Sequence, residues 1–326
     1  MKKNIYILIA IIAIFSALAG YYYVYQTKGA NGLEKVSLRL KWIDQAQFAG
    51  YYLANSRGLY IDKNLKVEIH PGGPDISPVQ MVTTGIDDFG ITGADQIILA
   101  REKGIPLVAL AVLYKDSPVT IMSLEKKNIK KPKDLEGKKV EVVYGRDEEV
   151  IYRILLEKEG VDRKKINEVP SLADYSRVIS EQVDARVDYE LNGGILLPLK
   201  GFPLNLIKPR DYGINFYGDT LFTTEEMIRK NPETVRSFVE AIIEGWKEAI
   251  ADQKSATDEV MKINSTLDRE QQLKFLEYSV PLIMKKGDIG YSEKEIWEEM
   301  QTMLLSQGVL KNPVDIDKVF TNEFLK

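Results

Sequence analysis

The chain has 326 residues, 44% hydrophobic and 28% charged, which excludes a wholly disordered or multi-span membrane protein and is typical of one large or two ordinary globular domains. It has no cysteine and a single histidine, which excludes disulfides, thiol nucleophiles and zinc sites built on cysteine or several histidines. The formal net charge is −4, and residues 1–33 carry lysines but no acidic residue, so the remainder is more acidic still and unsuited to nucleic acid.

The N-terminal segment is typical of an exported protein. Lys2 and Lys3 precede an uncharged, largely apolar run over 4–27, which is the pattern of a secretion signal and is also long enough to span a bilayer. Cleavage after Ala19 and retention as a membrane anchor both fit. The tyrosine cluster at 21–25 favours an anchor, because tyrosine gathers at membrane interfaces. In either case the positive-inside rule predicts a body outside the cytoplasm.

Strand-like and helix-like segments alternate from residue 36 onward. In the first unit we expect strands at 36–40, 65–69, 88–92 and 107–114, and helices at 48–56, 78–84 and 95–103. Ser77 is the expected cap of the second helix, with proline at its first position. Asp95 is open to two interpretations, a helix cap or a ligand contact. This alternation predicts an α/β protein with mostly parallel sheets.

The pattern restarts after a basic stretch at 126–132, which we interpret as a solvated loop and not as a nucleic-acid patch. In the second unit we expect strands at 139–143, 166–169, 185–188 and 204–208, and helices at 147–159 and 173–182. The last third is predicted to be helical, at 225–230, 232–251, 255–263, 269–278 and 293–306.

No common catalytic motif is present: the chain has no Walker-type glycine loop, no G-x-G-x-x-G, no G-x-S-x-G and no H-E-x-x-H. The HPGGPD segment at 70–75 fits a tight turn or a backbone loop that approaches a ligand, and both interpretations stay open.

Aromatic, amide and carboxylate side chains gather at the ends of predicted strands, at 42–48, 144–146, 188–192 and 212–219. In open α/β sheets, ligands bind outside the carboxyl ends of the strands. Flat aromatic faces with a few hydrogen-bonding groups suit a planar, polar heterocycle. The alternative is that these aromatic residues only pack a domain interface.

Several segments resemble one family. They are 40–54 (LKWIDQAQFAGYYLA), 71–75 (PGGPD), 88–95 (DFGITGAD), 100–108 (AREKGIPLV), 211–215 (DYGIN) and 219–223 (DTLFT). Through them the chain resembles the extracytoplasmic substrate-binding proteins of ABC transporters, in the branch similar to thiamine-pyrimidine synthesis enzymes and pyrimidine-precursor binders. The resemblance covers residues 36–265.

The resemblance implies a two-lobed, periplasmic-binding-protein-like α/β fold of type II with a helical C-terminal region, whose lobes close on a buried ligand. Residues 1–34 would be the signal or anchor and linker, 35–116 the first part of lobe I, 117–216 lobe II, and 217–326 the return to lobe I with the C-terminal helices. Two hinge crossings are expected, near 114–119 and 212–217.

Carried over by position, the resemblance also implies ligand contacts from both lobes. The implied lobe I contacts are Trp42, Asp44 and Gln47, and the implied rim residues are Gly73, Asp95 and Ser117. The implied lobe II contacts are Tyr144, Tyr189, Asn192 and Tyr217. No catalytic residue, metal or cofactor is expected.

Two departures from the family pattern bear on function. The enzyme branch carries a histidine where Phe48 stands and a cysteine cluster that this chain cannot have, so we expect a binding protein and not an enzyme. Pyrimidine binders often carry a glutamate beside the second-lobe asparagine, where this chain has Asn192 and Gly193. Glu190 could substitute only if its side chain faces the cleft.

We therefore expect a monomeric protein that captures a small aromatic heterocycle, above all a thiamine pyrimidine precursor, and delivers it to an ABC permease. Its other expected partner is the membrane, through the N-terminal segment, and nucleic acid is not a partner. One alternative is a binder of the same fold for riboflavin-like or sulfonate- and nitrate-type ligands. Another is a membrane-anchored ligand-sensing domain.

Overall fold

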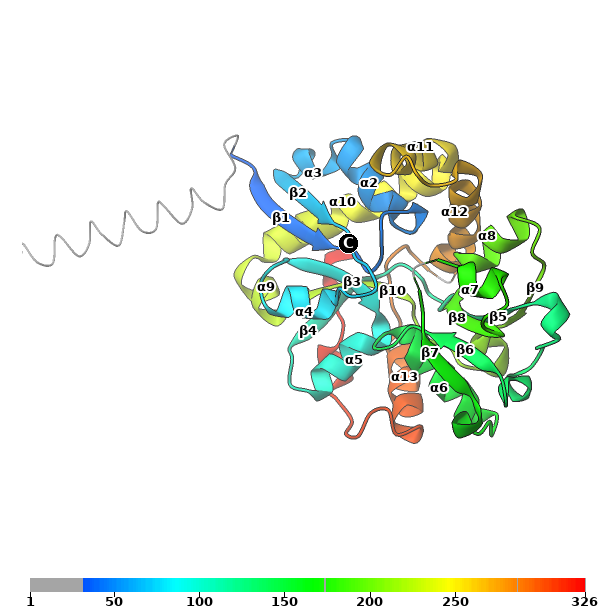
Figure 1. The fold of residues 1–326 in the computed structure, drawn as a ribbon. Coiled ribbons are helices and arrows are strands. Elements are labelled where there is room, and N and C mark those ends of the chain that lie inside the picture. Colours follow the sequence, from blue (N-terminus) through cyan, green and yellow to red (C-terminus); the bar gives the residue numbers. More distant parts are fainter. Residues whose placement is uncertain (1–31, 173, 286, 326) are drawn as a thin grey trace, which may run out of the picture.

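Two five-stranded mixed sheets organise the chain into two α/β lobes (Figure 1). The computed structural model describes residues 32–172, 174–285 and 287–325. The predicted N-terminal signal or anchor lies outside the described residues. Among the helices within those ranges, none combines the length and apolar character that a bilayer crossing requires.

The sheet of lobe I has the strand order β2–β1–β3–β10–β4. Its strands are β1 (Glu34–Arg39), β2 (Leu65–His70), β3 (Phe89–Gly93), β4 (Leu107–Val112) and β10 (Asp219–Thr224). β1 runs parallel to β2 and β3, whereas β10 is antiparallel to β3 and β4. In this register Asp219, the first residue of β10, pairs with Gly93, the last residue of β3.

The sheet of lobe II repeats this plan with the order β7–β6–β8–β5–β9. Its strands are β5 (Val119–Leu124), β6 (Lys139–Val142), β7 (Asn167–Pro170), β8 (Ala185–Tyr189) and β9 (Leu204–Ile207). β6 is parallel to β7 and β8, and β5 is antiparallel to β8 and β9. The expectation of mostly parallel sheets is thus modified, because each sheet contains a strand that runs antiparallel to both of its neighbours.

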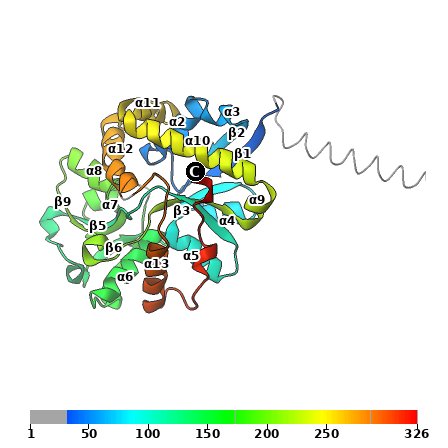
Figure 2. The ribbon, with the colours of Figure 1, turned by 180° about the vertical axis from the view of Figure 1, so that it is seen from behind.

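Helices cover the faces of both sheets (Figures 1 and 2). Those of lobe I are α2 (Ala49–Ser56), α3 (Leu59–Asp62), α4 (Pro78–Thr83), α5 (Ala94–Glu102), α9 (Glu225–Lys230), α10 (Pro232–Ala251) and α11 (Gln253–Ile263). Those of lobe II are α6 (Asp147–Lys158), α7 (Ser176–Ile179) and α8 (Gly193–Leu199). Near the C-terminus, α12 (Arg269–Met284) contacts α8 of lobe II as well as α11, and α13 (Lys294–Ser306) packs against α5.

α10, the longest helix among the described residues, lies very close to α2. Its buried side chains recur at helical spacing, with Phe238, Ile242 and Trp246 on one face. A Cβ atom on Gly245 would lie 2.3 Å from the carbonyl oxygen of Gly50, and one on Gly50 would lie 2.4 Å from the Trp246 ring. Both glycines are therefore required by the close approach of the two helices and not by backbone conformation.

The chain passes from one sheet to the other twice, between β4 and β5 and between β9 and β10. The backbone N–H of Ser117 donates to the carbonyl of Phe216, and that of Gly218 donates to the carbonyl of Tyr114, each over 2.8 Å. The crossings are thus hydrogen-bonded to each other.

Most predicted elements are present within a few residues, with several corrections. β5, β10 and α8 were not predicted, because β5 and β10 show no alternation of apolar and polar residues and α8 contains two glycines and a proline. The predicted helix at 173–182 is wrong: only α7 is helical there, and Glu181 has a left-handed backbone with a φ of 59°. The cap interpretation of Asp95 is also wrong, because Gly93 is the N-cap of α5 and Asp95 lies in its first turn.

Candidate functional site

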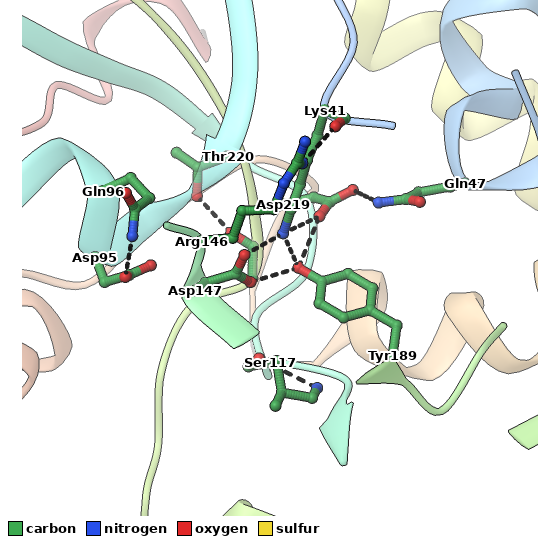
Figure 3. A network of polar contacts seen from close by, with 12 residues as sticks. Lys41, Gln47, Asp95, Gln96, Ser117, Arg146, Asp147, Tyr189, Asp219 and Thr220 are labelled. Carbon is green, nitrogen blue, oxygen red and sulfur yellow. Dashed lines mark hydrogen bonds and ion pairs between the residues drawn. The ribbon is translucent and has the colours of Figure 1, made fainter. Parts of the chain in front are cut away.

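A buried polar network joins the two lobes (Figure 3). The Lys41 ammonium, from lobe I, lies 2.6 Å from Oδ1 of Asp147 in lobe II and also donates to the hydroxyl of Tyr189. This hydroxyl donates to Oδ2 of Asp147 over 2.6 Å. Oδ1 of Asp219 lies 3.8 Å from the ammonium. At most 4% of each of these residues is exposed, so the network is shielded from water.

The topology of the two sheets brings these residues together. Lys41 follows the end of β1, Tyr189 is the last residue of β8, and Asp147 is the first residue of α6, the helix that follows β6. Carboxyl ends of parallel strands share one edge of a sheet, which is where ligands bind in open α/β folds. Asp219 begins its strand, but because β10 is antiparallel to β3 it lies at the same edge.

Burial and the neighbouring charges set the protonation of the network. Burial by itself would lower the pKa of Lys41, but the charges of Asp147, Glu148 and Asp219 raise it. Burial would raise the pKa of Asp147, but the Lys41 charge and hydrogen bonds hold it below its usual value. Burial raises the pKa of Asp219 to about 6, against the opposing effect of Lys41. Lys41 and Asp147 therefore form a charged pair at neutral pH.

Two further carboxyl groups lie near this pair. Burial, together with the charge of Asp147, raises the pKa of Asp95 to about 7 and that of Glu148 well above its usual value. Oδ1 of Asp95 and Oε2 of Glu148 are buried and have no hydrogen-bond partner among the described residues. Leaving a buried polar atom unsatisfied costs about 1–3 kcal/mol, so the site favours a molecule that can form hydrogen bonds with these oxygens.

Arg146 makes a second connection between the lobes. Its Nη1 donates to the carbonyl of Lys41 over 2.8 Å, and its Nη2 donates to the carbonyls of Gly73 and, over 3.2 Å, Ile76. The guanidinium also lies over the Trp42 ring, 5.1 Å from its centroid, where cation and ring attract each other. Arg146 thus holds the 73–76 loop and one face of Trp42 against lobe II.

Amide side chains form a third connection. Nε2 of Gln45 donates to Oε1 of Gln47 over 2.7 Å and to Oδ1 of Asn192 in lobe II over 3.2 Å. Nε2 of Gln47 donates to Oδ2 of Asp219 over 2.6 Å. Gln47 therefore fixes the Asp219 carboxylate whose other oxygen faces Lys41.

Two cavities lie along the contact between the lobes. One, of about 180 Å³, is lined by 74–79, Thr92 and Gln96 of lobe I and by 144–147 of lobe II. The other, of only about 10 Å³, has walls from Trp42, Gln47, Val143, Glu148, Arg186, Asp188, Tyr189 and Asn192. Lys41 belongs to the walls of both cavities, so its side chain lies between them.

The structure brings most of the predicted contact residues to this region. Those that line the smaller cavity are Trp42, Gln47, Tyr189 and Asn192. Tyr144, 43% exposed, lines the larger one. The Gly73 carbonyl accepts the bond from Arg146, and Asp95 carries one of the unsatisfied oxygens. Their role as ligand contacts stays a prediction.

Five predicted residues line neither cavity: Gly73 and Asp95, whose contacts are given above, and Asp44, Ser117 and Tyr217. Asp44 accepts a hydrogen bond from the Tyr52 hydroxyl within lobe I, over 2.7 Å. Ser117 lies in the hinge crossing and its Oγ accepts from the N–H of Val119. The Tyr217 hydroxyl accepts from the N–H of Glu293 over 2.9 Å, and its ring packs edge-on against Trp297.

Glu190 does not take the place of the missing second-lobe glutamate. Its carboxylate pairs with Lys208 over 2.8 Å and Arg210 over 2.6 Å. It lines a separate cavity of about 640 Å³ between α8, β9 and α12. A side chain could not stand at Gly193 either, because a Cβ atom there would lie 2.5 Å from the Tyr175 ring.

The charged centre of the site was not predicted from the sequence; it consists of Lys41, Arg146, Asp147 and Asp219. Lys41 and Asp219 belong to segments that carry the family resemblance. Arg146 belongs to the segment at 144–146, and Asp147 begins the helix predicted at 147–159. The signal that could have found Lys41 is a lysine directly after a strand in an otherwise apolar and aromatic segment. Asp147 gives no such signal, because an acidic first turn is ordinary in helices.

A family model described as NMT1/THI5 like matches residues 45–256. The chain is 25% identical to a riboflavin-binding protein, RibY, from Chloroflexus aurantiacus, over 90% of this chain and 86% of that protein. It is 24% identical to a formylaminopyrimidine-binding protein from Halalkalibacterium halodurans, over 90% and 91%. It is also 22% identical, over 90% and 88%, to THI11 from Saccharomyces cerevisiae, named as a 4-amino-5-hydroxymethyl-2-methylpyrimidine phosphate synthase.

Among solved structures, the periplasmic aliphatic sulphonate binding protein SsuA from Escherichia coli superposes with a TM-score of 0.70. The match covers 90% of this chain and 99% of that one, at 18% identity. This confirms the expected two-lobed periplasmic-binding-protein fold.

Proposed function

The chain belongs to the NMT1/THI5-like family, and on that premise we propose that it is an extracytoplasmic solute-binding protein that delivers a thiamine pyrimidine precursor to an ABC permease. The observation that carries the proposal is the position of the polar network and its cavities, between two lobes that a hinge connects. A ligand held there would be enclosed by both lobes, and its binding would stabilise the closed arrangement.

The chemistry of the larger cavity supports a small polar ring as ligand. The phenol of Tyr144 provides a flat face, Arg146 and Asp147 provide charge, and Thr92 and Ser77 provide hydroxyl groups. Apolar faces with a few convergent polar groups are typical of sites for planar heterocycles.

The volume of the larger cavity favours a ligand with a single ring over a flavin, which has three fused rings. At about 180 Å³ it is smaller than the ~300–1,000 Å³ common for sites of drug-sized ligands. A flavin would need the two cavities to merge, which requires Lys41 to leave its position between them. A single pyrimidine ring needs less rearrangement and is therefore our preferred ligand, with riboflavin-like compounds as the alternative.

We infer a binding role without catalysis, although synthases are among the relatives. Phe48, which stands where the resemblance implies a catalytic histidine, is fully buried and packs against Tyr51 with 6.5 Å between ring centroids. The absence of cysteine from the sequence also removes the cysteine cluster of the enzyme branch.

The same proposal includes the lobe boundaries, the cellular location and the oligomeric state of the protein. We propose lobe boundaries at 35–116, 117–216 and 217–326, which place β1–β4 and β10 in lobe I and β5–β9 in lobe II. The N-terminal segment would serve as signal or anchor at the outer face of the membrane, and the protein would act as a monomer.

Thermal unfolding of the purified protein tests the proposal. The ligands are thiamine, the hydroxymethyl- and formylaminomethyl-aminopyrimidines, riboflavin, taurine and nitrate. A ligand that binds only the folded state adds about 2.7 kcal/mol at 100 times its dissociation constant, so the pyrimidine that binds should raise the midpoint clearly. A rise with riboflavin or taurine alone would overturn the pyrimidine assignment, and no rise with any of them would contradict the transport role.

A further inference from the structure

Acidic groups outnumber basic groups at the interlobe network. Among the described residues, the carboxyl groups of Asp95, Asp147, Glu148 and Asp219 all interact electrostatically with Lys41 or with one another. Besides Lys41, the network has one other cation, Arg146, whose guanidinium is engaged by backbone carbonyls of lobe I. Arg186, nearby, already pairs with Glu141 and Asp188. The site therefore has more acceptors than its own donors satisfy.

Two buried carboxyl oxygens without hydrogen-bond partners are a second, independent sign that the site has too few partners for its polar atoms. Oδ1 of Asp95 belongs to a residue that is 0% exposed, and Oε2 of Glu148 to one that is 7% exposed. Neither atom has a hydrogen-bond partner among the described residues. Buried acceptors without partners are uncommon in folded proteins and call for a specific explanation. A bound group with several N–H donors would satisfy them.

Lys41 occupies the middle of this region. Its ammonium has bonds to Asp147 and Tyr189 and lies near Asp219 (Figure 3), and Lys41 lines both cavities. An ammonium carries three donors on a flexible four-carbon stem. Such a side chain can both fill an acceptor-rich site and withdraw from it.

We propose that the Lys41 ammonium occupies the subsite for a positively charged or amino group of the ligand, so that the ligand is an amine or amino-substituted heterocycle that displaces it. This inference rests on the proposed function, since it names the ligand chemistry of the same site. Asp147, Asp219 and the Tyr189 hydroxyl form the subsite. Without ligand, Lys41 satisfies these groups and holds the lobes together; with ligand, the amino group takes its place.

Displacement by a ligand would explain why a buried lysine is present at this position. A buried ion pair adds little net stability, because the desolvation of both charges offsets their attraction. Exchange of the lysine ammonium for a protonated ligand amine leaves the count of charges in the subsite unchanged, and exchange for a neutral exocyclic amine still supplies N–H donors to Asp147 and Asp219. A neutral ligand without N–H donors could not make this exchange, because it would leave Asp147 and Asp219 buried without a partner.

Small-angle scattering of the ligand-free protein tests the subsite without reference to the transport role. The variants are Lys41→Met, Lys41→Ala and Lys41→Arg, with Lys66→Met, an exposed lysine on β2, as matched control. We expect a larger radius of gyration for Lys41→Met and Lys41→Ala, and wild-type values for Lys41→Arg and Lys66→Met. Propylammonium should restore the compact form of Lys41→Ala, whereas propanol at the same concentration should not.

Calorimetric titration then tests displacement. The probes are 4-amino-5-hydroxymethyl-2-methylpyrimidine and its analogue without the exocyclic amine. Lys41→Met should bind the amino compound about tenfold more tightly than the wild type, because the competing ammonium is gone, and should prefer it to the analogue by about tenfold or more. Lys41→Arg should bind it no more tightly than the wild type.

The outcomes separate this inference from the proposed function. Rescue by propylammonium with no binding of either pyrimidine would support the subsite and overturn the pyrimidine as ligand. Pyrimidine binding that weakens in Lys41→Met would overturn displacement and make Lys41 a direct ligand contact. Ligand-free variants that all stay compact, or rescue by propanol as well, would overturn the subsite; circular dichroism of each variant establishes that it is folded.

Discussion

Gly93 at the end of β3 faces the side chain of Asp147 across the two lobes, so closely that a Cβ atom on Gly93 would lie 2.6 Å from the Cβ of Asp147. The backbone of Gly93 has a φ of −66° and a ψ of 143°, which any residue adopts. A Cβ atom there would also lie 2.7 Å from Oδ1 of Asp95 in lobe I, so the glycine is needed for the close approach of both aspartates and not for its backbone conformation.

Gly93→Ala should weaken ligand binding while lobe I stays folded. Overpacking costs about 1–3 kcal/mol, so we expect affinity to fall by about tenfold. Gly194→Ala, on α8, is the matched control, because a Cβ atom there would lie at an ordinary 3.5 Å from its nearest neighbour, the Cβ of Glu190. Titration calorimetry of both variants checks this, and equal affinities would show that closure tolerates the extra methyl group.

Trp42→Ala should weaken ligand binding by at least about tenfold, since the ring is a large, partly buried surface beside the smaller cavity. Its loss also removes the partner of the Arg146 guanidinium. Tyr291→Ala, which removes a ring that is 45% exposed, serves as control. Unchanged affinity in Trp42→Ala would make Trp42 a packing residue.

Asp95→Asn should stabilise the protein at alkaline pH. Burial and Asp147 raise the pKa of Asp95 from 3.8 to about 7. The folded state therefore binds a proton that the unfolded state has released, and stability is lost as the pH rises from about 4 through 7. The variant avoids this loss, so its midpoint should exceed that of the wild type by about 3 °C or more at pH 8 and match it at pH 4.

Calorimetric melts at several pH values measure this difference. Glu157→Gln, which removes an exposed carboxylate on α6, is the control variant. A difference between Asp95→Asn and the wild type that is the same at pH 4 and pH 8 would contradict a raised pKa.

Gly245→Ala should destabilise lobe I. The new methyl group would meet the Gly50 carbonyl at 2.3 Å, and backbone cannot move aside as a side-chain end can. We expect a loss of about 1–3 kcal/mol in the free energy of unfolding, measured by urea denaturation. Glu244→Ala, at the preceding exposed position, should change it by less than about 0.5 kcal/mol.

Local patterns predicted much of the fold. The predicted helix at 232–251 coincides with α10, because its apolar residues repeat at helical spacing and a proline stands at its first position. The apolar run at 107–114 contains β4, a strand buried on both faces. β5 and β10 escaped prediction because their environment is supplied by strands distant in the sequence, as when Asp219 of β10 pairs with Gly93.

The sequence by itself determined the class of protein. Its composition excluded thiol and paired-histidine chemistry, and its motifs carried the resemblance to substrate-binding proteins. Only the tertiary structure decided which side chains meet. Lys41 and Asp147 are 106 residues apart, and no local pattern relates them. They become partners because two separately formed lobes place their strand ends face to face, and burial at that contact makes the pairing of charges decisive.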